Sequence, residues 1–250
     1  MATQSVEFAS VSFIPASGRE ILCDISLRVE PGATMALLGR SGSGKTTLLR
    51  TVNALVTPTS GFVLIGDSDV AIADVIPLRR SIGYVIQETG LFPHMTVERN
   101  VALPLLLSGE QGQEAITRRV EQMLLMVGLN YAELAARYPW QLSGGQRQRV
   151  GVARALVAEP RVLLMDEPFG ALDPLTRAEM QTMLRSLLRG VGVTTLIVTH
   201  DLEEALYLAD RVVLLEAGRV VADLAAGEVR GSEIDAVRKY VAATQRSDAA

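Results

Sequence analysis

An eight-residue loop constrains the fold of this chain more than any other stretch. It reads Gly39-Arg40-Ser41-Gly42-Ser43-Gly44-Lys45-Thr46 and matches the pattern GxxxxGK[ST] at every fixed position. The apolar residues 35–38 before it predict a buried strand, and helical spacing follows it at Leu48, Leu49, Val52 and Leu55. This context predicts a loop that binds the phosphates of a nucleoside triphosphate. The alternative is a glycine- and serine-rich turn that matches by chance.

The residue types in the loop suit phosphate binding. Its glycines permit tight turns and leave backbone N–H groups open to phosphate oxygens, and the helix that follows presents the positive end of its dipole. Lys45 is expected at the β and γ phosphates, and the Thr46 hydroxyl is expected to ligate Mg²⁺. The other positions, Arg40, Ser41 and Ser43 in the loop and Thr47 just after it, complete the predicted nucleotide contacts.

Length and composition exclude several classes of protein. The 250 residues can bury a substantial core, with 48% hydrophobic and 21% charged residues. A formal charge of −4 argues against broad nucleic-acid binding. The single cysteine, Cys23, is expected at a half-buried strand position in a reducing compartment. No signal-peptide pattern and no apolar run near ~18 residues is present, so we expect a cytoplasmic protein.

The pattern of elements predicts an α/β fold. Residues 6–30 alternate as antiparallel strands do, and short apolar runs predict further strands at 62–65, 82–86, 162–165, 195–198 and 212–215. Helical spacing dominates residues 96–137, where Gly128 is a plausible stop and Trp140 follows as a packing anchor, and an amphipathic helix is expected at 174–189. The predicted class is therefore a phosphate-loop core with a mainly parallel sheet, an antiparallel β subdomain near the N-terminus and an inserted helical subdomain.

We predict one domain over residues 1–250. Residues 1–95 and 160–225 form the nucleotide-binding core with its antiparallel part, and residues 96–158 form the helical subdomain. Residues 226–250 form a C-terminal helix and tail.

Two acids and a histidine stand at predicted strand ends, where open α/β sheets bind ligands. Asp166 is expected to hold Mg²⁺, and Glu167 to orient or deprotonate an attacking water. The alternative is a pair of exposed helix-capping acids. His200 could contact the γ phosphate or hold Glu167 and the water in line, and alternatively it packs beside a helix N-terminus formed by Asp201 and Glu204.

A second anion site is predicted at Leu142-Ser143-Gly144-Gly145-Gln146, which precedes an apolar-periodic helix. Ser143 can cap this helix, and the glycines let its first N–H groups meet a phosphate. One triphosphate needs both this site and the first loop only if the two converge.

At this point the chain resembles the ATP-binding-cassette ATPases, whose signature LSGGQ is matched letter for letter. Nearly the whole chain takes part, and six motifs stand in the family's order: the loop at 39–46, Gln87, the signature at 142–146, the acids at 166 and 167, Ala171-Leu172-Asp173, and His200. The resemblance implies an ATP-dependent head-to-tail homodimer, in which the signature of one copy closes on the ATP held by the other.

The resemblance also implies roles for single residues. Gln87 would ligate Mg²⁺ and sense a transmembrane partner, and Ser143 and Gly145, with Gly144 and Gln146 beside them, would meet the opposite γ phosphate. Asp173 would bridge the two sites, and before Pro174 it also makes a good N-cap. The family usually stacks adenine on an aromatic near the first strands, whereas this chain has Pro15 there, with Phe13 as the possible substitute.

Residues 82–97 look most like those of importers of glycine betaine and related quaternary amines, and Leu78-Arg79-Arg80 agrees. The implied partners are integral-membrane permease subunits, met by exposed residues 88–96, and indirectly an extracytoplasmic solute-binding protein, with no nucleic acid. The implied location is peripheral, on the cytoplasmic face of the inner membrane. Alternatives are an amino-acid importer, a soluble ATPase of DNA repair or translation, and a nucleotide-gated binding module without turnover.

Overall fold

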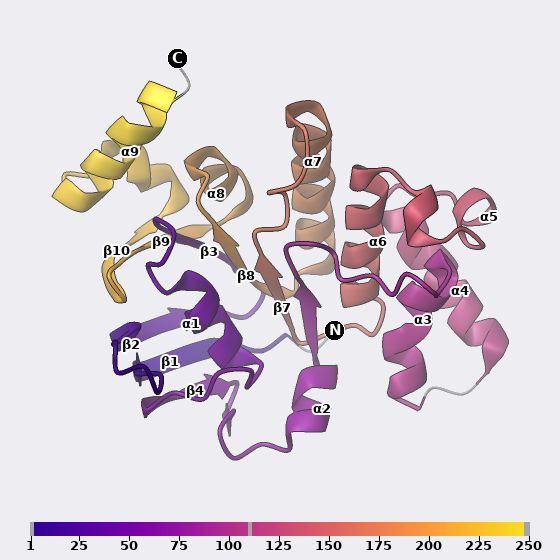
Figure 1. Cartoon of the computed structure of the whole chain (residues 1–250), viewed down its shortest axis with the longest axis horizontal. Helices are drawn as coiled ribbons and strands as arrows, with labels where there is room; N and C mark the ends of the chain where they lie inside the picture. Colours follow the sequence, from indigo (N-terminus) through magenta and orange to yellow (C-terminus); the bar gives the residue numbers. More distant parts are fainter. Residues whose placement is uncertain (1–2, 110–111, 248–250) are drawn as a thin grey trace. The chain divides into compact units, whose positions relative to one another are not determined.

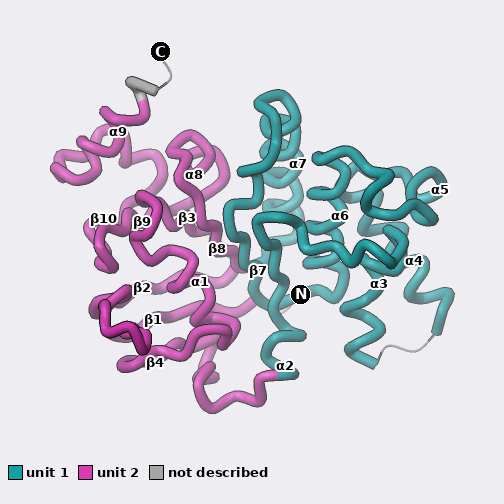
Figure 2. The backbone as a smooth tube through the Cα atoms, viewed as in Figure 1, with its two compact units in different colours: residues 1–2, 76–193 teal, residues 3–75, 194–250 magenta. Residues whose placement is uncertain are grey.

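The computed structural model describes residues 3–109 and 112–247, which form two compact units (Figure 2). Unit 1 is continuous in sequence and contains residues 76–193. Unit 2 is assembled from residues 3–75 and from the chain after residue 193. Within the described residues, no helix has both the length and the apolar character needed to span a membrane.

Unit 2 contains an antiparallel sheet with the strand order β2-β1-β4-β5 (Figure 1). Its strands are β1 (Val6–Phe13), β2 (Leu22–Val29), β4 (Ser60–Ile65) and β5 (Ser68–Asp69). Buried and exposed side chains alternate along most of β2, as expected for a strand with one face against a core. The predicted antiparallel part near the N-terminus is therefore confirmed.

A second group of strands in unit 2 supports the loop at 39–46. Strand β3 (Thr34–Leu38) pairs in parallel with both β8 (Thr194–Thr199) and β9 (Arg211–Glu216), and β10 (Arg219–Ala225) pairs antiparallel with β9. Every residue of β3 and β8 is buried, which explains the apolar runs 35–38 and 196–198 at their centres. The helices of this unit are α1 (Lys45–Val52), α8 (Leu202–Leu208) and α9 (Asp235–Ser247), with a 3₁₀ segment at Ala226–Gly231.

Helix α1 is shorter than the sequence predicts. It ends at Val52, whereas the spacing of apolar residues extends to Leu55. Ala54 adopts a left-handed backbone with φ of 55°, and the amides of Leu55 and Val56 both turn back to the carbonyl of Arg50. Leu55 is 52% exposed and lies outside the helix, so the prediction that the helical spacing includes it is wrong.

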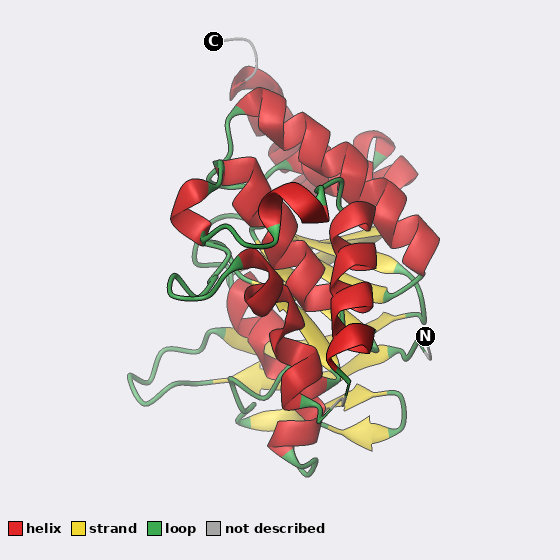
Figure 3. Cartoon of the chain, turned by 90° about the vertical axis from the view of Figure 1, so that its right-hand side faces the viewer, coloured by secondary structure: helices red, strands yellow, loops and turns green. Residues whose placement is uncertain are grey.

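Unit 1 combines a pair of parallel strands with most of the helices, which Figure 3 distinguishes by colour. Strand β6 (Ile82–Val85) pairs with β7 (Val162–Asp166). The helices are α3 (Val97–Leu107), α4 (Gln113–Met126), α5 (Tyr131–Leu134), α6 (Gly144–Leu156) and α7 (Pro174–Val191), and α2 (Val75–Arg80) begins at the last residue of unit 2. Gly128, with φ of 73°, follows α4 and confirms the predicted stop.

Trp140 does not anchor a core. It lies in the 3₁₀ turn Pro139–Gln141, is 66% exposed and stacks on Tyr138 with 4.5 Å between ring centroids. Pro139 takes the buried position of this turn, so the neighbouring indole faces outward. The observed elements confirm the predicted α/β class, with its antiparallel sheet and helical insert. The domain bounds at 96, 158 and 225 stay a prediction.

Candidate active site

The loop at 39–46 follows β3 and is shaped by contacts that leave no space for side chains at two glycines. A Cβ on Gly39 would collide with the carbonyl oxygen of Leu215 and with Ser43 Oγ. Gly44 has φ of 101°, and a Cβ there would lie 2.9 Å from the Ile21 carbonyl oxygen. These positions require glycine because both the space and the backbone conformation exclude other residues.

Lys45 folds back over the loop that precedes it. Its ammonium donates to the carbonyl oxygens of Gly39 at 2.8 Å and Arg40 at 3.0 Å, and the residue is 5% exposed. Ser43 Oγ is buried and, within the described chain, has no hydrogen-bond partner. Gly44, the N-cap of α1, provides no side-chain cap for the first amides of the helix. A cradle of this kind fits phosphate oxygens, which accept hydrogen bonds from amides, hydroxyl and ammonium.

His200 is brought to the same sheet edge as this loop. In the parallel pair of β3 and β8, Leu38 is in register with Thr199, so Gly39 and His200 each follow directly paired residues. The side chain of His200 is exposed. The next residue, Asp201, caps α8 by accepting from the Glu204 amide at 3.1 Å, which confirms the predicted helix N-terminus.

In unit 1, Gln87 and Glu167 converge in the same way. Val85 of β6 pairs with Met165 of β7, and Gln87 and Glu167 each lie two residues beyond this pair. Gln87 Nε2 lies 3.8 Å and Glu167 Oε2 3.9 Å from the point where a Cβ on Gly170 would stand. The Gln87 amide and the Glu167 carboxylate therefore both lie close to one point beside Gly170.

The two acids differ in environment. Asp166 ends β7, is 7% exposed and accepts a weak hydrogen bond of 3.5 Å from the Tyr84 hydroxyl. Glu167 is half-buried and has φ of 47°, a left-handed conformation that is uncommon outside glycine. Such strained residues cluster at functional sites, so the backbone of Glu167 supports a chemical role for its side chain.

The signature segment forms a capping box at the start of α6. Ser143 Oγ accepts from the Gln146 amide at 3.2 Å, and Gln146 Oε1 accepts from the Ser143 amide at 2.9 Å. The capping role predicted for Ser143 is confirmed, and the side chain of Gln146 is used in the same box. Ser143 and Gly144 are exposed, whereas Gly145 is buried, and a Cβ on it would lie 2.6 Å from Thr176 Cγ2.

Asp173 caps the long helix α7, as predicted. Its Oδ1 accepts from the Thr176 amide at 3.1 Å, and Pro174 occupies the first helical position. Hydrogen bonds from Thr176, first from its side chain and then from its backbone, lower the pKa of the Asp173 carboxyl below its usual value. A second function as a bridge between sites stays a prediction.

The predicted site residues thus form two groups. The loop 39–46, Thr47 and His200 lie in unit 2, and Gln87, the acids 166 and 167, the signature 142–146 and Asp173 lie in unit 1.

Sequence reasoning missed Tyr84 and a clamp made by Arg154. From α6, the Arg154 guanidinium donates to the carbonyl oxygens of Thr89 and Gly90, both at 2.7 Å, and burial lowers its pKa. These carbonyls lie two and three residues after Gln87, so Arg154 fixes the segment that leaves the site. The available signal was an arginine beside the apolar positions Val150, Ala153 and Val157.

Comparison with known proteins identifies the family. The model of the ABC transporter family matches residues 22–170. The chain belongs to the ABC transporter family. Its ABC fold is also seen in a solved structure titled a dimeric post-hydrolysis state of the ATP-binding cassette MJ0796 bound to ADP and Pi. That structure has a TM-score of 0.78 and 33% identity, and the match covers 88% of this chain and 98% of the other.

Curated relatives include importer subunits with different substrates. The chain is 44% identical over 217 residues to the glycine betaine/carnitine/choline transport ATP-binding protein OpuCA of Bacillus subtilis, covering 86% of this chain and 56% of the relative. It is 50% identical over 200 residues to the sulfate/thiosulfate import ATP-binding protein CysA 2 of Agrobacterium fabrum, covering 79% and 57%. The chain therefore spans little more than half the length of these relatives.

Proposed function

We propose that this ABC protein hydrolyses ATP to power import of a small solute through a membrane permease. The observation that carries the proposal is the register of β3 and β8, because it sets a phosphate-binding loop and an imidazole at one sheet edge. A triphosphate held by the loop amides and Lys45 then has His200 beside its reactive end.

The proposed reaction is attack of water on the γ phosphorus with ADP as the leaving group. Glu167 accepts the proton of the water, and the Gln87 amide, which shares its surroundings near Gly170, orients that water. His200 donates to the γ phosphate or holds Glu167 and the water in line. Lys45 stabilises the charge on the transferred group and acts with Glu167 and His200 in catalysis.

The proposed metal is Mg²⁺, held by Thr46, Gln87 and Asp166. These residues offer hydroxyl, amide and carboxylate oxygens, which are the donors that Mg²⁺ prefers, and the metal neutralises phosphate charge when bound. Within the described ranges, no group of three or more His, Cys, Asp or Glu side chains could hold a metal.

The proposed active form is a head-to-tail homodimer. Ser143 and Gly144 are exposed at the N-terminus of the 13-residue helix α6, where amides and the helix dipole favour an anion. In the dimer, residues 143–146 of one copy complete the ATP site begun by the loop of the other, and Asp173 bridges the two sites.

A hollow of about 570 Å³ in unit 1 is the proposed permease contact. Apolar residues such as Phe92, Leu103 and Leu107 line it together with Arg79, Arg80 and Arg154. The adjoining residues 92–94 are exposed, in agreement with the predicted partner surface. Arg154 lines the hollow and also donates hydrogen bonds to the carbonyl oxygens of Thr89 and Gly90, which follow Gln87. A permease segment bound in the hollow would therefore contact the arginine that holds the Gln87 segment in place.

The proposed cargo is glycine betaine or another quaternary amine, delivered by an extracytoplasmic solute-binding protein while this subunit lies peripherally on the cytoplasmic face of the membrane. The resemblance of residues 82–97 and the relative OpuCA support it.

Turnover and uptake test the proposed function together. The purified chain is expected to release phosphate from ATP, and cells that produce it with its permease are expected to accumulate labelled glycine betaine. Uptake of sulfate or an amino acid instead of glycine betaine would contradict the proposed cargo assignment. Absence of ATP turnover in both the free and the permease-bound protein would contradict the activity.

A further inference from the structure

The helix near the C-terminus contacts the segment that carries His200. Tyr240 on α9 donates a hydrogen bond of 2.7 Å from its hydroxyl to the backbone carbonyl oxygen of His200. Both residues belong to unit 2, and α9 lies beyond residues 22–170 matched by the family model. His200 and Tyr240 both lie outside that match, and the contact joins the proposed γ-phosphate histidine to helix α9.

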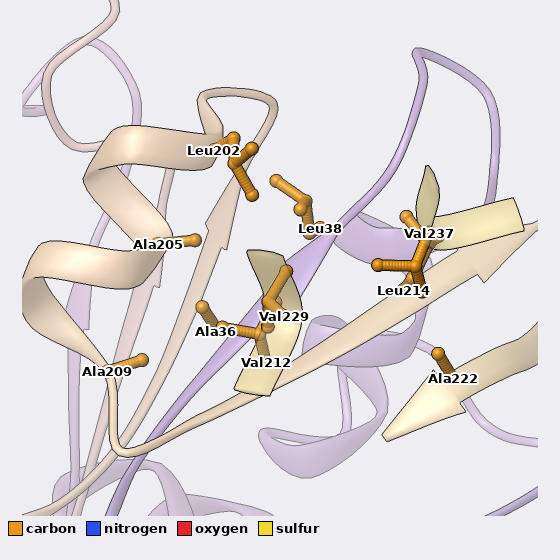
Figure 4. Packing of buried hydrophobic residues seen from close by; sticks show 10 residues of the cluster. All are labelled: Ala36, Leu38, Leu202, Ala205, Ala209, Val212, Leu214, Ala222, Val229 and Val237. Atoms are coloured by element: carbon orange, nitrogen blue, oxygen red, sulfur yellow. The ribbon is translucent and has the colours of Figure 1, made fainter. Parts of the chain in front are cut away.

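Apolar packing holds α9 in place for this contact. Val237 is 3% exposed and belongs to a buried cluster with Leu38 and Leu202 (Figure 4). Tyr240 and Val241 pack against this cluster. Leu38 directly precedes Gly39 of the phosphate loop, and Leu202 lies two residues after His200. One hydrophobic cluster therefore supports the loop, the histidine segment and α9.

The turn between β8 and α8 is fixed by hydrogen bonds at successive residues. The Asp201 amide donates to Thr199 Oγ1 at 3.0 Å, and the Asp201 side chain caps α8. The His200 carbonyl belongs to the same peptide group as the Asp201 amide, and Tyr240 donates to it from the other side of that group. Because this carbonyl sets the peptide plane next to the His200 Cα, the bond from Tyr240 limits where an exposed imidazole can point.

The hydroxyl of Tyr240 remains a donor at all physiological pH values. Burial, followed by the Asp201 carboxylate, raises the pKa of Tyr240 to about 12, and the Arg40 guanidinium opposes that shift.

We propose that Tyr240 is a positioning residue for His200 and that its hydroxyl, donated from α9 to the His200 carbonyl, raises the efficiency of ATP hydrolysis. The proposal rests on the proposed function, in which His200 meets the γ phosphate or orders the attacking water. Tyr240 does not touch the reacting atoms, and it acts through the backbone of His200.

The test uses Tyr240→Phe in the full chain, which keeps the ring and its packing and removes the hydroxyl. Loss of one hydrogen bond is expected to lower kcat about five- to tenfold, with the KM for ATP changed less than about twofold because the loop is intact. His200→Ala is the reference, and the double variant Tyr240→Phe/His200→Ala is expected to be no slower than His200→Ala alone. An effect of the same size in both backgrounds would overturn the proposal.

A spectroscopic measurement separates positioning from activity. The chain has two histidines, His94 and His200, so imidazole NMR signals can be assigned with His94→Gln. Tyr240→Phe is expected to shift or broaden the His200 signals and to leave those of His94 unchanged, and unchanged His200 signals would contradict the proposal.

A packing control keeps stability apart from positioning. Val241→Ala trims the same helix without removing a hydroxyl and is expected to lower the melting temperature while keeping kcat. A kcat loss in Val241→Ala equal to that in Tyr240→Phe would overturn the role of the hydroxyl. If wild-type turns over ATP but His200→Ala does so equally well, the inference fails and the ATPase assignment stands. A wild-type chain without turnover contradicts the proposed function and the inference with it.

Discussion

Glu167 combines a strained backbone with a carboxylate close to an amide. Its φ of 47° places it in a region that costs a residue other than glycine about 1–3 kcal/mol. Its Oε2 and Gln87 Nε2 lie within 4 Å of the same point beside Gly170. This backbone conformation and the nearby amide together support a chemical role for the Glu167 carboxylate.

Replacing Glu167 by glutamine removes the proposed base and keeps the shape of the side chain. Glu167→Gln is expected to lower ATP hydrolysis by roughly 10² to 10⁴ and to leave ATP affinity unchanged. Phosphate release and binding of a fluorescent ATP analogue measure the two effects. Glu179→Gln, the same change at an exposed position of α7, serves as the control. Full turnover in Glu167→Gln would remove this residue from the mechanism.

Tyr131 is expected to make the free energy of unfolding depend on pH in the alkaline range. Burial, followed by the hydrogen bond of 2.8 Å to Glu98, raises the pKa of Tyr131 from 10.0 to about 12. Its contribution to stability is present below pH 10 and is lost as pH rises towards 12, because the unfolded chain gives up this proton first. Urea unfolding between pH 9 and 11 should show a steeper loss for wild-type than for Tyr131→Phe, and parallel curves would contradict this.

At the level of elements, the sequence predicts best where one signal dominates. Strands β3, β7 and β8 each contain a continuous apolar run, and their predicted bounds differ from the observed ones by at most one residue at each end. The apolar spacing predicts a longer helix α1 because it does not indicate the left-handed backbone of Ala54, which ends the helical conformation. The prediction that Trp140 packs in a core is wrong because Pro139 occupies the buried position of the turn.

The candidate site divides in the same way. Residues within local motifs, such as the loop and the capping box of Ser143, are predictable because a few consecutive residues determine their geometry. Tyr84, Arg154 and Tyr240 were not predictable as site residues. Their contacts join positions 40 to 82 residues apart, and for Arg154 and Tyr240 the partner is a backbone carbonyl, which every residue has.

Two glycines near the end of α7 should respond oppositely to alanine. Gly190 lies within the helix, and a Cβ there meets nothing within 4 Å, so Gly190→Ala is expected to raise the free energy of unfolding by about 0.4–1 kcal/mol. Gly192 caps the helix with φ of 66°, so Gly192→Ala is expected to lower it by about 1 kcal/mol. Denaturant unfolding measures both, and changes of the same sign would refute this account of the helix end.

For the whole molecule, the proposed dimer predicts complementation between inactive chains. In a mixture of Lys45→Ala with Ser143→Arg, one site of each mixed dimer has an intact loop and an intact signature. Half of randomly formed dimers are mixed, so turnover is expected to recover to at most about a quarter of wild-type. Phosphate release over a range of mixing ratios measures this recovery.

A second mixture provides the control for complementation. In Lys45→Ala with Glu167→Gln, each mutation disables the site of its own chain, so every dimer should stay inactive. Recovery in this mixture, or its absence in the first at all ratios, would argue against a site shared between copies.

The position of β3 in the sequence affects how the protein is made. This apolar strand is complete at residue 38, yet both of its pairing partners, β8 and β9, begin only at residues 194 and 211. At about 5–20 residues per second, a ribosome needs on the order of ten seconds or more to supply them. During that time both edges of β3 lack their native partners. The strand that carries the phosphate loop therefore stays without its native partners until most of the chain has been made.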